Sequence, residues 1–300
     1  MIRIVTDSTA SIPKDIAEEN GIEVATMYVS RDGVEYEDAT MDLDVFYRDI
    51  YDMVDNIPKS SQPSKGVFEA MFEEMAKAGD ELLGIFMSAK MSGTVDCALQ
   101  AARSVASHHV GFNFRIIDTS SNSFDEAWPV LAAASGRDAG CSLDQCCELV
   151  ERSMCASRWL FTPESLRFLK AGGRIGTASA LLGNLMKICP VLTVSDGETA
   201  TFAKVRTQKK ALATIANKLA ADIADYGLKN LVVHYIGSAV EASRWAREVV
   251  EPIAAREVPV IPVSACIGVH VGPAIGIVYE CEHALPGKLS FNPASLVYSS

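Results

Sequence analysis

The stretch from Ser88 to Thr94, Ser-Ala-Lys-Met-Ser-Gly-Thr, contains side chains that could bind an anion. Ser92 and the final threonine offer hydroxyl groups, and the glycine between them has no side chain to keep a ligand from the backbone. An apolar run, Leu82 to Met87, precedes the stretch and a helical pattern follows it, which predicts a turn between a strand and a helix. In a parallel sheet such turns offer unpaired helix N–H groups to ligands. The same residue types also begin ordinary helices, so this turn alone identifies no site.

Three further segments are rich in hydroxyl groups. Thr6-Asp7-Ser8-Thr9 ends the first apolar run, Asp118-Thr119-Ser120-Ser121 follows a predicted strand from Phe114 to Ile117, and Ser60-Ser61-Gln62-Pro63-Ser64 forms a loop before a predicted helix. Ser64 could cap that helix, but a cap requires only one hydroxyl, so the structure does not require the other serines. Because carboxyl ends of parallel strands meet at one edge, we expect these segments to share a rim with the Ser88 turn.

Between the first strand and the Ser60 segment, the sequence predicts an excursion from the main sheet. Ile22 to Val29 and Val34 to Tyr36 flank the hairpin signal Arg31-Asp32-Gly33, and the acidic segment Asp38 to Asp44 leads into a helical pattern.

The pattern changes near Cys155, where we place a boundary between domains of residues 1–156 and 157–300. In the second half, the two glycines of Gly172-Gly173-Arg174 would let another group approach the backbone closely, and the arginine adds a positive charge to the turn. Two glycines can also simply end a helix. Lys204, Arg206, Lys209 and Lys210 form a dense basic run that is either a solvated helix start or a surface facing an anion. His270 stands in a glycine turn between two predicted strands, where a lone histidine is more often structural than catalytic.

Charge and composition exclude several classes of protein. The 300 residues carry a formal net charge of −11, which repels phosphate backbones and anionic bilayers, so no nucleic-acid partner is expected. No apolar run is long enough for stable membrane insertion, and Asp7 comes too early for a signal peptide, so we expect a cytoplasmic protein. The eight cysteines are expected to be reduced, and those from Cys141 to Cys155 match no standard zinc spacing; we interpret them as core residues, with metal binding as the alternative.

Six motifs together resemble the DegV family of bacterial fatty-acid-binding proteins. They are Thr6-Asp7-Ser8-Thr9, Ser60-Ser61-Gln62-Pro63-Ser64, Ser88 to Thr94, Gly172-Gly173-Arg174, Lys204-Val205-Arg206 and His270-Val271-Gly272-Pro273, in register over roughly residues 1 to 281. The resemblance implies an α/β fold with two α/β domains, an N-terminal parallel sheet with helices on both faces and a C-terminal mixed sheet with helices. It implies a lipid-binding protein rather than an enzyme, with one long-chain fatty acid held between the domains and no metal or other cofactor.

The resemblance also implies roles for individual residues. The fatty acid would be bound by Ser60, Ser61, Ser92, Gly93, Thr94 and His270, with its carboxylate on the hydroxyls of Ser60 and Ser92 and its acyl chain in an apolar tunnel. Ser60 replaces the usual threonine, so it keeps the hydroxyl but loses a methyl that restricts the rotamer. Some family members present the fatty acid to a separate ATP-dependent kinase that makes acyl phosphate for phospholipid metabolism, and Arg174, Arg206 and His270 match the residues implicated in that step.

The chain departs from the family pattern at three places, one of which is Ala274, where the family commonly has a glycine after the Gly-Pro pair. The family usually has a glycine-rich helix start after Asp118, whereas Phe124-Asp125-Glu126-Ala127-Trp128 brings bulk and charge that could shorten or redirect the tunnel. The tail from Glu282 onward extends past the usual end and is expected to wrap the surface loosely.

An enzyme is the alternative function. In a serine-dependent acyl hydrolase or acyltransferase, Ser92 would be the nucleophile and His270 the base. No Gly-x-Ser-x-Gly pattern surrounds Ser92, and the sequence assigns no acid to orient His270, so we prefer the binding protein.

Overall fold

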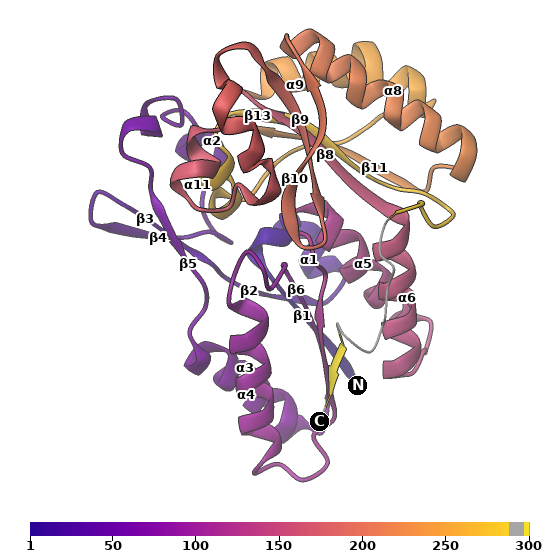
Figure 1. Cartoon of the computed structure of the whole chain (residues 1–300). Coiled ribbons are helices and arrows are strands. Elements are labelled where there is room, and N and C mark those ends of the chain that lie inside the picture. The colour runs from indigo at the N-terminus through magenta and orange to yellow at the C-terminus, as the bar shows by residue number, and fades with distance from the viewer. Residues whose placement is uncertain (288–296, 300) are drawn as a thin grey trace.

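A computed structural model describes residues 1–287 and 297–299, and Figure 1 shows their arrangement. The first of three sheets has the strand order β14-β7-β6-β1-β2. Its strands are β1 (Ile2–Asp7), β2 (Ile22–Ala25), β6 (Glu81–Phe86), β7 (Phe114–Asp118) and β14 (Val297–Ser299). Strands β1, β2, β6 and β7 run parallel to their neighbours, so their carboxyl ends lie at one edge, as the hydroxyl-rich segments predicted.

Helices cover both faces of this sheet because its strands are apolar on both sides. Ile4 and Val5 are fully buried, and they pack into different hydrophobic clusters on opposite faces. One face is covered by α3 (Lys65–Ala78) and α4 (Thr94–Ala106), and the other by α1 (Lys14–Glu19), α5 (Phe124–Asp138) and α6 (Leu143–Ala156). The predicted parallel sheet with helices on both faces is confirmed.

The last described residues pair with this first sheet. β14 runs antiparallel to β7, with Tyr298 opposite Ile116. The expectation of a loosely wrapped tail is therefore wrong for residues 297–299, because β7 would otherwise leave an unpaired sheet edge. Residues 288–296 and 300 of the predicted tail lie outside the described part of the chain.

The second sheet is mixed and has the order β10-β9-β8-β13-β11-β12. Its strands are β8 (Ser157–Pro163), β9 (Cys189–Ser195), β10 (Glu198–Val205), β11 (Asn230–Ile236), β12 (Val260–Pro262) and β13 (Ala274–Glu280). One face packs against α8 (Gln208–Tyr226), α9 (Ala239–Trp245), the π-helix η4 (Ala246–Val250) and α10 (Glu251–Ala254). The other face, with α7 (Arg167–Ala171), the 3-10 segment η3 (Gly176–Lys187) and α11 (Ala265–Val271), faces the first sheet.

The predicted excursion forms a third, small sheet. Its order is β4-β3-β5, from β3 (Tyr28–Arg31), β4 (Val34–Glu37) and β5 (Lys59–Ser61), and it is joined by α2 (Leu43–Tyr47) and the 3-10 segment η2 (Asp52–Asp55). The single run predicted from Ile22 to Val29 is divided between β2 and β3, which belong to different sheets. The sequence did not show this break because the apolar pattern continues across it.

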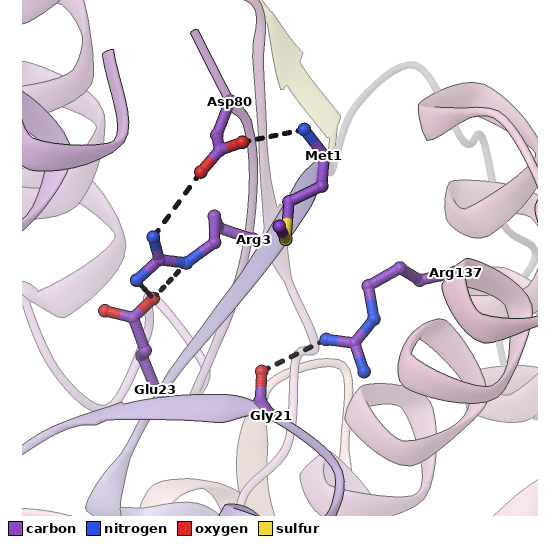
Figure 2. A network of polar contacts seen from close by, with 6 residues as sticks. All are labelled: Met1, Arg3, Gly21, Glu23, Asp80 and Arg137. Carbon is purple, nitrogen blue, oxygen red and sulfur yellow. Dashed lines mark hydrogen bonds and ion pairs between the residues drawn. The ribbon is translucent and has the colours of Figure 1, made fainter. Parts of the chain in front are cut away.

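Ion pairs tie together the amino-terminal ends of neighbouring strands in the first sheet (Figure 2). The Met1 amino group lies 2.7 Å from Asp80 Oδ1, and Arg3 Nε donates to Glu23 Oε1 at 2.7 Å. Arg3 also reaches Asp80 Oδ2 at 3.5 Å. Partly exposed pairs of this kind contribute about 0–1 kcal/mol each. They lie at the edge opposite the hydroxyl-rich turns, so this end of the sheet is structural.

The described part of the chain contains no helix long and apolar enough to cross a membrane. Cys97, Cys141, Cys146, Cys147, Cys189, Cys266 and Cys281 form no disulfide. The predicted capping box of Ser142 and Gln145 begins α6.

Candidate ligand-binding site

A cavity of about 270 Å³ is lined by strands of the second sheet, by loops that follow β6 and β7 of the first sheet, and by residues of the excursion. Six polar residues of its wall are at least partly exposed and mark the mouth: Ser60, Ser61, Gln62, Ser92, Arg174 and His270. The apolar residues are buried and form the interior, among them Met27, Met87, Trp159, Phe161, Ile267 and Val271. Such a cavity suits an amphiphile with a polar head and an apolar body.

Ser60 and His270 meet at the mouth. Ser60 Oγ lies 2.7 Å from His270 Nε2, although 210 positions separate them in the sequence. Ser60 and Ser61 end the short strand β5 rather than lying in a loop as predicted, and Ser60 pairs with Val29 of β3. His270 lies in helix α11 and not in a turn. Both hydroxyl and imidazole are therefore carried by regular elements that limit their movement.

His270 is uncharged at neutral pH. Burial, and then the positive charge of Arg174, lower the pKa of His270 to about 4. Its Nδ1 atom is buried and has no hydrogen-bond partner among the described residues. The neutral imidazole can donate or accept one bond at Nε2, so Ser60 and His270 together can offer a proton to a ligand oxygen.

A glycine and an arginine from the second half shape the His270 environment. A Cβ atom on Gly172, which ends α7, would overlap His270 Nδ1, so only glycine fits there without displacing the ring. Arg174 Nη1 donates to the Gly172 carbonyl at 2.6 Å, and its Nε donates to the Met91 carbonyl at 3.3 Å. Arg174 thereby joins the Gly-Gly-Arg turn to the Ser88 turn across the mouth.

Asp38 of the excursion holds the start of helix α11. The Cys266 N–H donates to Asp38 Oδ1 at 3.0 Å, and Ser8 Oγ donates to Asp38 Oδ2 at 2.5 Å. Burial raises the pKa of Asp38 to about 6 against the effect of these donors. The position of His270 therefore depends on the acidic segment that the sequence assigned only to an excursion.

The Ser88 turn contributes Ser92 and Gly93 to the cavity wall. Ser92 Oγ lies 2.8 Å from Thr94 Oγ1, and Thr94 is fully buried behind it. A Cβ on Gly93 would lie 2.7 Å from Gln62 Oε1, which is closer than side chains tolerate. The missing side chain thus lets the Ser60 and Ser88 segments approach each other.

Six of the residues predicted to bind a fatty acid or a partner line this cavity, and two do not. Ser60, Ser61, Ser92, Gly93, Arg174 and His270 are part of its wall. Thr94 lies one layer behind, as the hydrogen-bond partner of Ser92. Arg206 is exposed just after β10 and is not part of the wall.

The other two hydroxyl-rich segments follow strands that end at the same edge of the sheet, as predicted, but none of their residues lines this cavity. Thr6 and Thr9 donate to the two carboxylate oxygens of Glu126, at 3.0 and 3.1 Å. Burial and the neighbouring Asp7 raise the pKa of Glu126 well above its usual value. These hydroxyls serve a buried carboxyl, while Thr119 and Ser120 line a separate cavity of about 80 Å³.

The aromatic inner wall is a feature that the sequence did not reveal. The Trp159 and Phe161 rings stack at 4.8 Å, and Trp159 meets His234 edge-on at 5.5 Å. Phe124 packs on the other side of His234 at 5.2 Å. The only sequence signal was the strand alternation that places Trp159 and Phe161 on one face.

The hydrogen bonds do not match the hydrolase alternative. His270 bonds to Ser60, whereas Ser92 bonds to Thr94. No carboxylate among the described residues bonds to His270 Nδ1, and a histidine with a pKa near 4 is a weak general base at neutral pH.

Known proteins share the sequence and the fold. The family model described as "uncharacterised protein, DegV family" matches residues 1–282. The chain belongs to the DegV family. A DegV domain-containing protein of Clostridium acetobutylicum is 39% identical over 287 residues, which cover 94% of this chain and 98% of that protein. The resemblance inferred from six motifs is thereby confirmed.

Solved DegV structures superpose closely on this chain. A DegV family protein from Thermus thermophilus, described by its fatty-acid binding, has a TM-score of 0.81 and 30% identity and covers 93% of this chain and 99% of its own. DegV of Bacillus subtilis, described as a fatty-acid-binding protein, has a TM-score of 0.82 and 28% identity with the same coverage. No group of His, Cys, Asp and Glu in the described residues could hold a metal ion.

Proposed function

We propose that this chain binds a long-chain fatty acid in the cavity between the two sheets. The carboxylate would lie at the mouth, within reach of Ser60, Ser92 and His270, and the acyl chain would fill the buried interior. The observation that carries this proposal is the cavity with a hydroxyl-lined mouth and an apolar interior. The fatty-acid binding described for its DegV relatives supports it.

The two ends of the ligand would contribute differently. Burying each methylene contributes roughly 0.8 kcal/mol, so the acyl chain provides most of the binding free energy. Each hydrogen bond to the charged carboxylate contributes about 1.5–3 kcal/mol at most, because its solvation by water is lost. The mouth would therefore fix the direction of the ligand, and the interior would determine affinity.

We further propose that the bound fatty acid is presented to a separate ATP-dependent kinase. The kinase would transfer the γ-phosphoryl group of ATP to a carboxylate oxygen, giving acyl phosphate and ADP. The partly exposed mouth supports this proposal, because a partner could reach the carboxylate without opening the interior. The exposed Arg174 lies beside that position, and Arg206 would contact the partner outside the cavity.

The decisive experiment is to identify what the protein binds. Organic-solvent extraction of the purified protein followed by mass spectrometry should release a fatty acid in near-stoichiometric amount. Ile267→Trp places a larger side chain in the buried interior and should abolish it, whereas Val240→Trp on the exposed surface of α9 should not. Circular dichroism would check that both variants fold. The proposal fails if no acyl lipid is extracted and added fatty acids do not bind.

A second measurement separates binding from catalysis. The 2.7 Å contact between Ser60 and His270 is the one observation that favours a serine enzyme. Mass spectrometry after incubation with an activated acyl ester should find no acyl group on Ser60 or Ser92. A covalent acyl-serine that requires His270 would instead support the hydrolase or acyltransferase.

A further inference from the structure

Asn122 places an amide in the wall of the largely apolar interior. It lies in the loop between β7 and α5, is 6% exposed and lines the cavity. Its Nδ2 lies 3.2 Å from the sulfur of Met91, while its Oδ1 is buried without a hydrogen-bond partner among the described residues. A buried carbonyl oxygen without a donor is rare in folded proteins, so it indicates a group that the site is built to receive.

The orientation of the amide decides what that group must be. A thioether sulfur can accept a hydrogen bond but cannot donate one, so Nδ2 faces Met91 and the carbonyl oxygen remains for a ligand. The opposite orientation would leave two N–H donors unused and place one acceptor against another. Within the described part of the chain, Asn122 Oδ1 therefore lacks a hydrogen-bond donor.

Thr199 adds a second polar side chain to the same interior. It belongs to β10 of the second sheet, is 4% exposed and lines the cavity. Its hydroxyl can donate or accept. A plain alkyl chain offers neither side chain a hydrogen bond, whereas an alcohol can donate to Asn122 Oδ1 and accept from the Thr199 hydroxyl.

We propose that the preferred ligand is a hydroxylated fatty acid whose hydroxyl group donates a hydrogen bond to Asn122 Oδ1. This proposal rests on the proposed function and narrows its ligand class. The carboxylate would lie at the mouth, as for any fatty acid. The hydroxyl would stand part-way along the acyl chain, because Asn122 is buried whereas the residues of the mouth are partly exposed.

The test compares hexadecanoic acid with its monohydroxy positional isomers by displacement of a fluorescent fatty acid. Wild-type protein should bind at least one isomer roughly tenfold tighter than the plain acid, the effect of one well-formed buried hydrogen bond. Asn122→Leu has a similar volume without the amide, so it should bind the plain acid at least as tightly and lose the preference. Asn56→Leu, at an exposed asparagine outside the cavity, should keep it.

The possible outcomes distinguish failure of the proposed preference for a hydroxylated acid from failure of the proposed fatty-acid binding. If plain acids bind and no hydroxylated isomer binds more tightly, an ordered water satisfies Asn122 and only this proposal fails. A preference that survives in Asn122→Leu would also overturn it. If no acid of either kind binds, the proposed function fails as well. Should Asn122→Leu not fold, Asn122→Ala serves the same comparison.

Discussion

Trp159 should set the longest acyl chain that the cavity accepts. Its side chain is 3% exposed, lines the interior, and stacks on Phe161 at 4.8 Å. Trp159 also packs against His234, which in turn packs against Phe124, and neither of these two residues lines the 270 Å³ cavity. Replacing Trp159 by alanine would remove this ring from the cavity wall and enlarge the cavity.

The magnitude follows from the size of the ring. Truncating a buried tryptophan costs about 3–5 kcal/mol of the free energy of unfolding. The space that it leaves could hold about three additional methylenes, each contributing roughly 0.8 kcal/mol when buried. Filling that space would contribute about 2.4 kcal/mol, which corresponds to an affinity about sixtyfold higher for the longer acid. We therefore expect the Trp159→Ala variant to prefer acids about three carbons longer than wild type does.

Isothermal titration with saturated acids of increasing length would measure this shift. Trp245→Ala is the matched control, because Trp245 is equally buried but belongs to the cluster on the far side of the second sheet. Both variants should lose stability, and only Trp159→Ala should change the preferred length. An unchanged length profile in Trp159→Ala would show that another part of the cavity limits the ligand.

Three further predictions concern the mouth and the buried histidines. Ser92→Ala should weaken fatty-acid binding about three- to tenfold in a displacement titration, because it removes one hydrogen bond and leaves the interior intact; complete loss would reverse our ranking of head and tail. Gly172→Ala should displace the His270 ring, since its Cβ would overlap Nδ1, and should weaken binding more than Ser92→Ala does; equal effects would mean that His270 does not contact the ligand. Burial lowers the pKa of His234 to about 4. Between about pH 6.5 and pH 4, His234 therefore binds a proton in the unfolded chain but not in the folded chain. Its contribution to stability is therefore present above pH 6.5 and lost as the pH falls. From pH 7 to pH 5, wild type should lose about 2 kcal/mol relative to His234→Gln in urea unfolding. Parallel pH profiles of the two proteins would refute this assignment.

Local features of the fold could be read from the sequence because neighbouring residues determine them. The strand from Leu82, the Ser88 turn and the helix after it follow from apolar periodicity and from residues that favour turns. The capping box of Ser142 and Gln145 depends on residues three positions apart. The six motifs also identified the DegV family, and with it the α/β fold of two packed sheets.

The site could be predicted only in part, because hydroxyl groups of the same type have different roles once the chain is folded. Ser60 and Ser92 line the cavity, whereas Thr6 and Thr9 satisfy the buried Glu126. Nothing in the spacing distinguishes these two pairs. The difference arises from α5, which begins beside the first strand and brings a carboxyl that must be hydrogen-bonded.

The sequence by itself determined strands β1, β6 and β7 of the first sheet, the capped start of α6 and the Ser88 turn, since these depend on contacts within a few residues. Only the tertiary structure decided that Ser60 would meet His270 across 210 positions, that Asp38 would hold the His270 helix, and that Asn122 would remain without a donor. Each of these depends on the packing of one sheet against another. Such packing joins residues whose separation along the chain carries no local signal of their contact.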